Sequence, residues 1–407
     1  MDEYRITRLG HLGDGIAEGP YFAPLTLPGE VITAQRDGDK LKDVKIVTPS
    51  SDRVAPPCRH FKSCGGCQLQ HASDDFMAEW KIDVVRTALS AQGIEADFRP
   101  ISTSPPLSRR RATFAARRTK KGAMAGFHAK ASDVIVEIPG CQLLDPELLS
   151  ARPVAEALAM AGASRKHSLD VAVTLSLNGL DILVRSGKPL DGPLRMELAQ
   201  LAEAHDLARL TWEDEVIATR LPPEQQFGGV IVVPPPGAFL QATQAGEARL
   251  RDDVLRITQG AKRVVDLFAG CVPFALPLAK NAEVHAVEGE TAMTKALDAG
   301  WRHGQGYGLK AVTHEARDLF RRPLMPDELS TFDAAVIDPP RAGAEAQIQQ
   351  LAESDIQVIA HVSCNPASFA RDARTLLSAG YVMGPIQVVD QFRWSTHVEL
   401  VAAFTRP

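Results

Sequence analysis

Three of the six cysteines in this 407-residue chain lie close together in the segment "CRHFKSCGGCQLQH". Cys58, Cys64 and Cys67 have the spacing C-x5-C-x2-C, and Cys141 stands apart in "IPGCQLLDP". Four thiolates can bind one zinc ion tetrahedrally or hold an iron–sulfur cluster. The two glycines between the second and third cysteines allow the backbone to turn, so that neighbouring thiolates can face one centre. The pattern therefore predicts a metal site.

The spacing leaves the identity of the metal open. Zinc modules usually contain two C-x2-C pairs, whereas this chain has one such pair and two single cysteines. Radical enzymes that carry an iron–sulfur cluster usually show C-x3-C-x2-C, and the five-residue gap argues against that class. Buried or free thiols without a metal are the remaining alternative.

The composition is ordinary for a globular protein, with 45% hydrophobic and 23% charged residues. The segment "MDEYRITRLG" lacks the apolar core of a signal peptide, and no apolar run approaches the ~20 residues that span a bilayer. We therefore expect a cytoplasmic protein without a membrane partner, in a compartment where thiols stay reduced. A disulfide is then a poor explanation for the clustered cysteines. The net charge of −5 does not by itself indicate a nucleic-acid partner.

A fifth cysteine, Cys364, occupies a different setting in "HVSCNPASFARD", between a predicted strand and a predicted helix. The dipole at a helix N-terminus is expected to lower the pKa of such a thiol and favour a nucleophilic thiolate, although a small buried core thiol is an equal alternative. Asp338, in "DPPRAG", ends the neighbouring strand. His397 and Glu399, in "STHVELVAAF", begin a later strand, and alone such a pair is typical of a surface salt bridge.

A nucleoside site is indicated by "VVDLFAG", a strand followed by a loop of small residues and a helix. Glu288 ends the next strand, where acidic residues bind ribose hydroxyls in dinucleotide folds. No G-x-G-x-x-G is present, so a pyrophosphate site is not expected. A ligand without phosphates, such as S-adenosylmethionine, fits this pattern better.

These residues require a multidomain α/β scaffold. Residues 1–53 contain short β-rich runs and turns, and residues 54–235 predict an α+β domain with a helix near 80–89 and a hairpin around Asn178-Gly179. Residues 236–407 alternate strand and helix candidates, with strands expected at 263–270, 283–289, 332–340 and 358–366. This alternation predicts a mostly parallel, doubly wound sheet, which binds ligands at the carboxyl ends of its strands.

A basic stretch lies between Asp97 and Asp133, where the chain has no acidic residue. A solvated pair of basic strands would explain this composition, but interleaved aromatic residues also suit single-stranded RNA. The residues expected to contact RNA are Arg109, Arg110, Arg111, Phe114, Arg117 and Phe127.

Together the motifs resemble the RNA uracil-5-methyltransferase family, specifically its iron–sulfur branch that acts on 23S ribosomal RNA. The resemblance covers nearly the whole chain. "GHLGDGIAEG…LTLPGE" is similar to the family's small TRAM barrel, an OB-like fold, and "FLQATQAGE", "DLFAG", "VEGE", "ARDLF", "DPPRAG" and "SCNPASFARD" follow in the family's order. The family's C-terminal domain is a Rossmann-like class I methyltransferase, so the resemblance implies that fold here.

The resemblance also implies roles for individual residues. Cys364 would be the nucleophile and Glu399 the base. S-adenosylmethionine would lie against Gln241, Phe268, Gly270, Glu288, Asp318 and Asp338, and a [4Fe–4S] cluster would bind Cys58, Cys64, Cys67 and Cys141. The expected partner is 23S ribosomal RNA, and we expect a monomer.

The implied chemistry activates an inert carbon. A thiolate that adds to C6 of uracil makes C5 nucleophilic, C5 then takes a methyl group, and a base removes the C5 proton so that the cysteine can leave. A glutamate is mostly charged near neutral pH, so Glu399 is expected to accept this proton without a large pKa shift. The target base must leave its helical stack to be reached.

The chain departs from the family at one loop. Val272 and Pro273 follow "DLFAGC", where the family usually carries a glycine. A β-branched residue tolerates a positive φ poorly and can hold the backbone away from a ligand, so this position is expected to affect cofactor affinity. Rival interpretations are a metal-stapled RNA-binding protein with weak or no methyl transfer, a transfer-RNA methyltransferase, and a small-molecule redox enzyme.

Overall fold

The N-terminal strands close into a small barrel. The computed structural model describes residues 1–406, and the barrel order is β1-β2-β3-β5-β4, with β1 paired to β4. Alternating side chains such as Ile6, Ile32 and Leu41 fill its interior because successive residues of a strand face opposite sides. The strands are β1 (Asp2–Leu9), β2 (Gly15–Ala17), β3 (Tyr21–Ala23), β4 (Val31–Asp37) and β5 (Lys40–Thr48). The predicted N-terminal β-barrel is confirmed.

A seven-stranded sheet forms the central part, with the order β13-β12-β11-β10-β7-β8-β9. Helix α3 packs on β7 and β8, and α4 packs on β12 and β13, so one face of the sheet is covered. The strands are β7 (Arg111–Arg118), β8 (Ala123–His128), β9 (Ile135–Val136), β10 (Leu169–Ser176), β11 (Gly179–Arg185), β12 (Arg209–Trp212) and β13 (Glu215–Thr219). The helices are α2 (Pro146–Leu149), α3 (Ala151–Gly162) and α4 (Gly192–Ala204).

The predicted hairpin at β10 and β11 is present, but its turn is shifted by one residue. Ser176 pairs with Gly179, so Leu177 and Asn178 form the turn instead of Asn178 and Gly179. Gly179 has a φ of 110° within the paired strand, a value that favours glycine. The prediction that Gly179 lies in the turn was therefore wrong, because Gly179 is the first residue of β11 and follows the turn.

The C-terminal sheet is doubly wound, as predicted. Its order is β18-β17-β16-β19-β20-β23-β22-β6, the first five strands are parallel, and β21 pairs with β23. The strands are β16 (Arg263–Leu267), β17 (Glu283–Glu288), β18 (Val312–Ala316), β19 (Ala334–Ile337), β20 (Val358–Ser363), β21 (Val382–Met383), β22 (Gln387–Asp390), β23 (Glu399–Thr405) and β6 (Ser102–Thr103).

Two layers of helices cover this sheet because neighbouring strand residues face opposite sides. Val265 belongs to a core with α1 and α10, whereas Val264 belongs to a core with α5 and α7. The helices are α1 (Asp74–Ser90), α5 (Gln244–Ile257), α6 (Ala275–Leu278), α7 (Thr291–Gly304), α8 (Pro326–Leu329), α9 (Glu345–Glu353) and α10 (Pro366–Ser378), with a 3-10 turn at Gln305–Tyr307. The hairpin of β14 (Gln225–Phe227) and β15 (Val230–Val232) packs beside α7.

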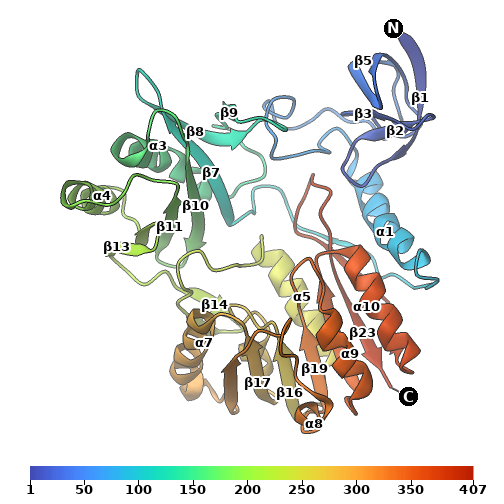
Figure 1. Ribbon diagram of the computed structural model, residues 1–407, viewed down its shortest axis with the longest axis vertical. Coiled ribbons are helices and arrows are strands. Elements are labelled where there is room, and N and C mark those ends of the chain that lie inside the picture. Colours follow the sequence, from blue (N-terminus) through green and yellow to red (C-terminus); the bar gives the residue numbers. More distant parts are fainter. Residues whose placement is uncertain (407) are drawn as a thin grey trace.

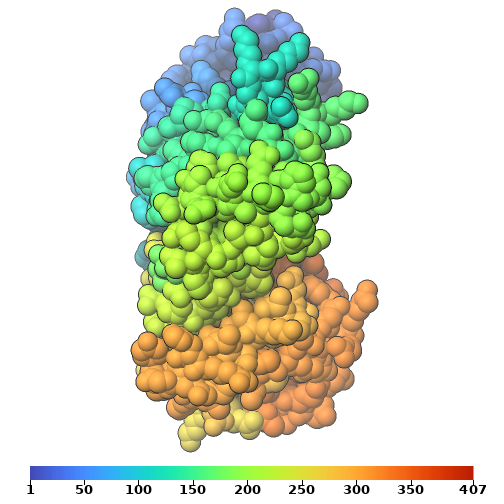
Figure 2. Space-filling view, turned by 90° about the vertical axis from the view of Figure 1, so that its left-hand side faces the viewer, coloured from blue at the N-terminus to red at the C-terminus, as the bar shows by residue number. Residues whose placement is uncertain are grey.

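Figure 1 shows how the three parts are arranged, with the barrel and the C-terminal sheet at opposite ends and the central sheet beside them. In Figure 2 the central residues, in green, lie between the N-terminal residues and the C-terminal residues. Helix α1 and strand β6 precede the central sheet in the sequence, yet they pack on the C-terminal sheet. Segments that precede and follow the central sheet in the sequence therefore pack together in the C-terminal part of the structure. In residues 1–406 no helix is long and apolar enough to cross a membrane.

Candidate active site

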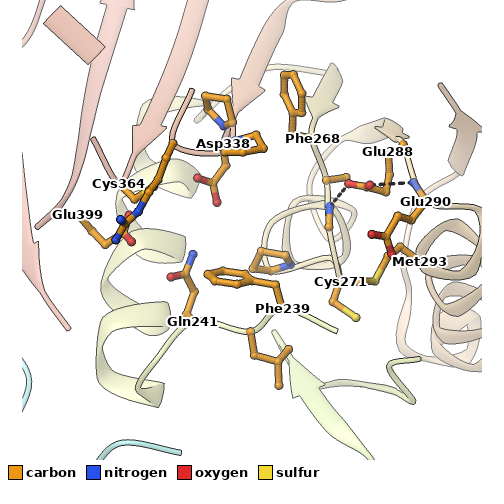
Figure 3. Close-up of a pocket in the computed structure, with 18 of the residues that line it drawn as sticks. Phe239, Gln241, Phe268, Cys271, Glu288, Glu290, Met293, Asp338, Cys364 and Glu399 are labelled. Carbon is orange, nitrogen blue, oxygen red and sulfur yellow. Dashed lines mark hydrogen bonds between the residues drawn. The ribbon is translucent and has the colours of Figure 1, made fainter. Parts of the chain in front are cut away.

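A cavity of about 840 Å³ opens at the carboxyl ends of β16, β17, β19 and β20. Its volume falls in the range of small-molecule sites, and its position is the one expected for a doubly wound sheet. The residues predicted for catalysis and cofactor binding all line it, although they come from widely separated segments: Gln241, Phe268, Gly270, Glu288, Asp318, Asp338, Cys364 and Glu399. Figure 3 shows several of these side chains facing the same space.

Glu288 organises the loop that follows β16. Its two carboxylate oxygens accept hydrogen bonds from the backbone amides of Gly270 and Glu290, both at 2.9 Å. Each oxygen keeps a lone pair that can accept a further hydrogen bond. The end of β17 therefore presents a fixed acceptor pair at the cavity wall.

The loop at Val272 keeps a conformation that suits glycine. Val272 has a φ of 64°, in the left-handed region, where a β-branched residue is strained. Its side chain is fully buried in the core beneath the loop, whereas Cys271 and Pro273 line the cavity. The valine side chain therefore does not occupy the space of a ligand. Val272 does not block the cofactor sterically.

Cys364 lies between β20 and α10, as predicted, but its thiol is not activated by that helix. Burial raises the pKa of the thiol to about 11, the charges of Glu399 and Asp338 raise it further, and Arg341 opposes them. Pro366 has no N–H, and the amide of Ala367 is taken by the side chain of Asn365. Burial therefore outweighs the helix N-terminus, and the expected lowering of the pKa of Cys364 is wrong.

The two carboxyl groups near Cys364 also favour their neutral forms. Burial raises the pKa of Asp338 to about 7. Burial, followed by the charge of Asp338, raises the pKa of Glu399 well above its ordinary value, while a hydrogen bond from Gln391 opposes this shift. The expectation that Glu399 needs no large shift is therefore wrong. His397 is exposed and Glu399 is 3% exposed, so the pair is not a surface salt bridge.

Gln391 is a site residue that the sequence did not reveal. Its amide nitrogen donates to the side-chain oxygen of Gln241 at 2.5 Å, and its oxygen accepts from the backbone amide of Ala242 at 2.7 Å. Gln391 also lowers the pKa of Glu399, against the larger effect of burial. It thereby connects the segment before α5 with the loop that precedes β23. No spacing or motif indicates this contact, because it joins residues about 150 positions apart.

The four predicted metal-ligating cysteines converge on one small cavity. Cys58, Cys64, Cys67 and Cys141 line it together with Phe127, and the open space between them is about 20 Å³, little more than one water molecule. Burial raises the pKa of Cys67 to about 12, and the neighbouring thiols raise it further. Within residues 1–406 no three ligand side chains are arranged around a single metal ion. The structure thus gathers the thiols without showing a metal site.

Comparisons with known proteins identify the family. A family model described as tRNA (uracil-5-)-methyltransferase matches residues 309–406. The chain is 44% identical to an uncharacterized RNA methyltransferase of Mesorhizobium japonicum, over 99% of this chain and 98% of that protein. It is 34% identical to the 23S rRNA (uracil(1939)-C(5))-methyltransferase RlmD of Halomonas elongata, over 100% of this chain and 89% of that protein. The chain belongs to the RNA uracil-5-methyltransferase family.

A solved structure of this family shares the fold. The Pyrococcus abyssi tRNA (uracil-54, C5)-methyltransferase, in complex with S-adenosyl-L-homocysteine, has a TM-score of 0.78 and 22% sequence identity, with 99% of each chain covered. The predicted methyltransferase fold and the predicted RNA uracil-5-methyltransferase class are therefore confirmed. The predicted iron–sulfur site is not shown by these comparisons.

Two of the predicted RNA contacts are wrong because the side chains are buried. Phe114 is fully buried, stacks on Phe127 and packs under α3, so no base can reach it. Arg110 is 5% exposed, forms an ion pair with Glu247 and donates to the backbone oxygen of Gln241 at 3.0 Å. Phe114 therefore belongs to the core of the central sheet, and Arg110 ties that sheet to α5 of the C-terminal domain.

The remaining predicted RNA contacts lie in three places. Arg109 and Arg111 line the cavity, and the guanidinium of Arg111 lies 4.1 Å from the ring centroid of the exposed Phe239. Arg117, at the other end of β7, lines a second cavity of about 630 Å³ together with Lys166 and Lys188. Phe127 lines the four-cysteine cavity and stacks on Phe114. Arg109, Arg111 and Arg117 are partly exposed and stay candidates for contact with RNA.

Proposed function

We propose that this protein transfers a methyl group from S-adenosylmethionine to C5 of a uridine in 23S ribosomal RNA through a covalent bond between Cys364 and C6. The observation that carries the proposal is the meeting of Cys364, Asp338 and Glu399 in one cavity with Gln241 and Glu288. A nucleophile, a base and an acceptor pair for a ribose are the parts that this reaction needs.

The cofactor would bind at the ends of β16 and β17. Glu288 suits the ribose hydroxyls because its oxygens are already fixed by two backbone amides. Phe268 offers an aromatic face beside Phe320, with ring centroids 5.3 Å apart. Asp318 accepts a hydrogen bond from the amide of Phe320, which holds that loop at the rim. When bound, S-adenosylmethionine supplies an electrophilic methyl group and a positive charge.

The carboxylates of Asp338 and Glu399 would each accept one proton during the reaction. The thiol of Cys364 would give its proton to Asp338 before the sulfur adds to C6, since Asp338 and Glu399 are the acidic groups close enough to raise its pKa. Addition would move an electron pair onto the ring, C5 would take the methyl group from the sulfonium, and S-adenosylhomocysteine would be the leaving group. Glu399 must be unprotonated when the C5 proton leaves. The ring double bond then forms again, and the thiolate departs.

The cofactor charge would help this sequence begin. A buried cation favours the ionised forms of neighbouring acids, so it opposes the burial that keeps Cys364, Asp338 and Glu399 neutral. Activation of the thiol would then depend on a bound cofactor. Without the cofactor, Cys364 would stay a protonated, unreactive thiol.

The test is the covalent adduct. RNA that contains 5-fluorouridine should form a stable protein–RNA adduct in the presence of S-adenosylmethionine, since fluorine at C5 cannot leave as a proton. Cys364→Ala should form none, whereas Cys271→Ala, a change at another cysteine of the cavity, should still form it. An adduct that maps to a residue other than Cys364, or no adduct with the native chain, would contradict the mechanism.

The choice of 23S ribosomal RNA rests on the relative from Halomonas elongata, which is similar over the whole chain. Transfer RNA is the second candidate, because the structural neighbour from Pyrococcus abyssi acts on tRNA. Equal amounts of unmodified 23S fragments and unmodified transfer RNA, incubated with labelled S-adenosylmethionine, would separate the two. Label in transfer RNA alone would overturn the ribosomal assignment.

We further propose that the four cysteines hold a [4Fe–4S] cluster with a structural role. The lining of their cavity offers thiol ligands and apolar side chains, which suits an iron–sulfur centre. Each thiolate of such a cluster binds a different iron, so the ligands need not surround a single point. Closing the cluster would fix the segment 58–67 against the segment between β9 and α2 that carries Cys141. Anaerobic purification should yield iron and sulfide in equal amounts, and stoichiometric zinc without iron would defeat the proposal.

A further inference from the structure

The hairpin loop between β22 and β23, residues 391–398, forms one wall of the reaction cavity. Phe392, His397 and Val398 line the cavity, and Glu399 begins β23 directly after them. The position of this loop therefore determines where the carboxylate of Glu399 lies relative to Cys364.

One buried ammonium group closes the base of this loop. Lys81 lies on α1, and its side chain is 0% exposed. Its Nζ donates to Oδ1 of Asp390 at 2.5 Å, to the backbone oxygen of His397 at 3.0 Å and to that of Phe392 at 3.3 Å. Asp390 ends β22, and the two carbonyls belong to the two ends of the loop. The three donors of the ammonium thus join both arms of the hairpin.

Other contacts from the same part of the chain hold the loop as well. The backbone amides of Gln68 and Leu69 donate to the backbone oxygen of Trp394 at 2.9 and 3.0 Å. The guanidinium of Arg393 donates to the carboxylate of Asp74 at 2.6 Å. Trp394 has a φ of 60°, a strained value for a tryptophan, so its surroundings must hold it in place. Contacts from residues 68–74 therefore help to fix the conformation of the loop 391–398.

The buried pair is poorly explained by stability alone. Removing an ammonium and a carboxylate from water costs several kcal/mol per ion, and an apolar pair of similar volume is often as stable. What the ammonium provides, and an apolar side chain does not, is three directed hydrogen bonds that meet at one point. That geometry is useful where a neighbouring residue must be placed to within a fraction of an ångström.

We propose that Lys81 is a positioning residue for the removal of the C5 proton: it fixes the loop 391–398 and so holds Glu399 over the methylated ring. Lys81 does not line the cavity and touches no reacting atom. The inference rests on the proposed function, because it assumes that Glu399 accepts this proton. It predicts that loss of Lys81 slows the release of the adduct more than its formation.

The test compares Lys81→Met with Lys295→Met, a matched change at an exposed position of α7. In Lys81→Met, S-adenosylhomocysteine should bind as in the native enzyme, because the β16–β17 end of the cavity is untouched. Turnover on native RNA should fall about 100-fold, the loss expected for a misplaced catalytic group. The methylated protein–RNA adduct should accumulate on denaturing gels, as it should in Glu399→Gln. Lys295→Met should do neither.

The outcomes separate the inference from the proposed function. If the native enzyme forms no adduct with 5-fluorouridine RNA, the proposed function fails. If it does, but Lys81→Met loses adduct formation and turnover to the same degree, Lys81 is merely structural and the inference fails. Should Lys81→Met not fold, Lys81→Gln takes its place, because its two N–H groups cannot serve three acceptors. A folded Lys81→Gln enzyme that releases product at the native rate would equally overturn the inference.

Discussion

The carboxylate of Glu288 accepts a hydrogen bond from the backbone amide of Gly270 at 2.9 Å, which ties the end of β17 to the loop after β16. Its other oxygen accepts from the amide of Glu290 at the same distance. A residue assigned to the cofactor by its position in a motif thus also builds the loop on which the cofactor would lie. Loss of its charge should therefore affect both.

Glu288→Gln should weaken the binding of S-adenosylmethionine by about 10- to 100-fold, the range for hydrogen bonds to a charged group. The new amide would turn a donor toward one of two backbone N–H groups, so the loop would lose an acceptor. Calorimetry gives the affinity, and Glu283→Gln, at the exposed start of the same strand, is the control. Equal affinities for the two variants would show that Glu288 does not contact the ligand.

The pKa of about 7 at Asp338 predicts that cofactor binding depends on pH. A cation favours ionised Asp338, so S-adenosylmethionine should release a proton on binding below pH 7, and its affinity should rise with pH up to that value. S-adenosylhomocysteine lacks the sulfonium charge and should show a much weaker dependence. Asp338→Asn should remove the difference between the two ligands. If both ligands show the same pH dependence in the native enzyme, Asp338 does not face the sulfur.

The order of motifs predicted the cavity well, because parallel strands bring their carboxyl ends to one edge of a sheet. Glu288, Asp338 and Cys364 each follow a strand, and all three line the same cavity. The pKa values were predicted poorly. A helix dipole can be read from a sequence, but the burial that raises the pKa of Cys364 depends on every segment packed around it.

The residues that sequence reasoning missed act across long distances in the chain. Lys81 contacts Asp390 and Gln391 contacts Gln241, and in both cases one partner stands in a segment with no motif. The prediction of RNA contacts in the basic stretch was wrong at two positions for a related reason. Arg110 lies just before β7 and Phe114 lies within it, and only the packing of α3 and α5 shows that these two positions are covered while Thr113 between them is exposed. Composition identifies a basic strand but does not distinguish its two faces.

Val272→Gly should destabilise the protein instead of improving it. Glycine would relieve about 1–2 kcal/mol of strain at the positive φ. It would also remove a fully buried side chain, at a cost of about 2–3 kcal/mol, and add backbone entropy to the unfolded chain. We expect the free energy of unfolding to fall by about 1–2 kcal/mol in denaturant titrations. Affinity for S-adenosylmethionine should not change, because the valine points away from the cavity, and a large gain in affinity would contradict this placement.

Arg110 and Arg117 should respond to the same substitution in opposite ways. Arg110→Met would leave Glu247 buried without a partner, so the free energy of unfolding should fall by about 3–5 kcal/mol. Arg117→Met should leave stability unchanged, because its side chain is half-buried beside Lys166 and Lys188 in an open cavity. It should weaken RNA binding and reduce the slope of log K against log salt by about 0.7, the value for one phosphate contact of a single strand. Filter binding at several salt concentrations measures the slope. An unchanged slope in Arg117→Met, or a reduced slope in a folded Arg110→Met protein, would exchange the roles of the two arginines.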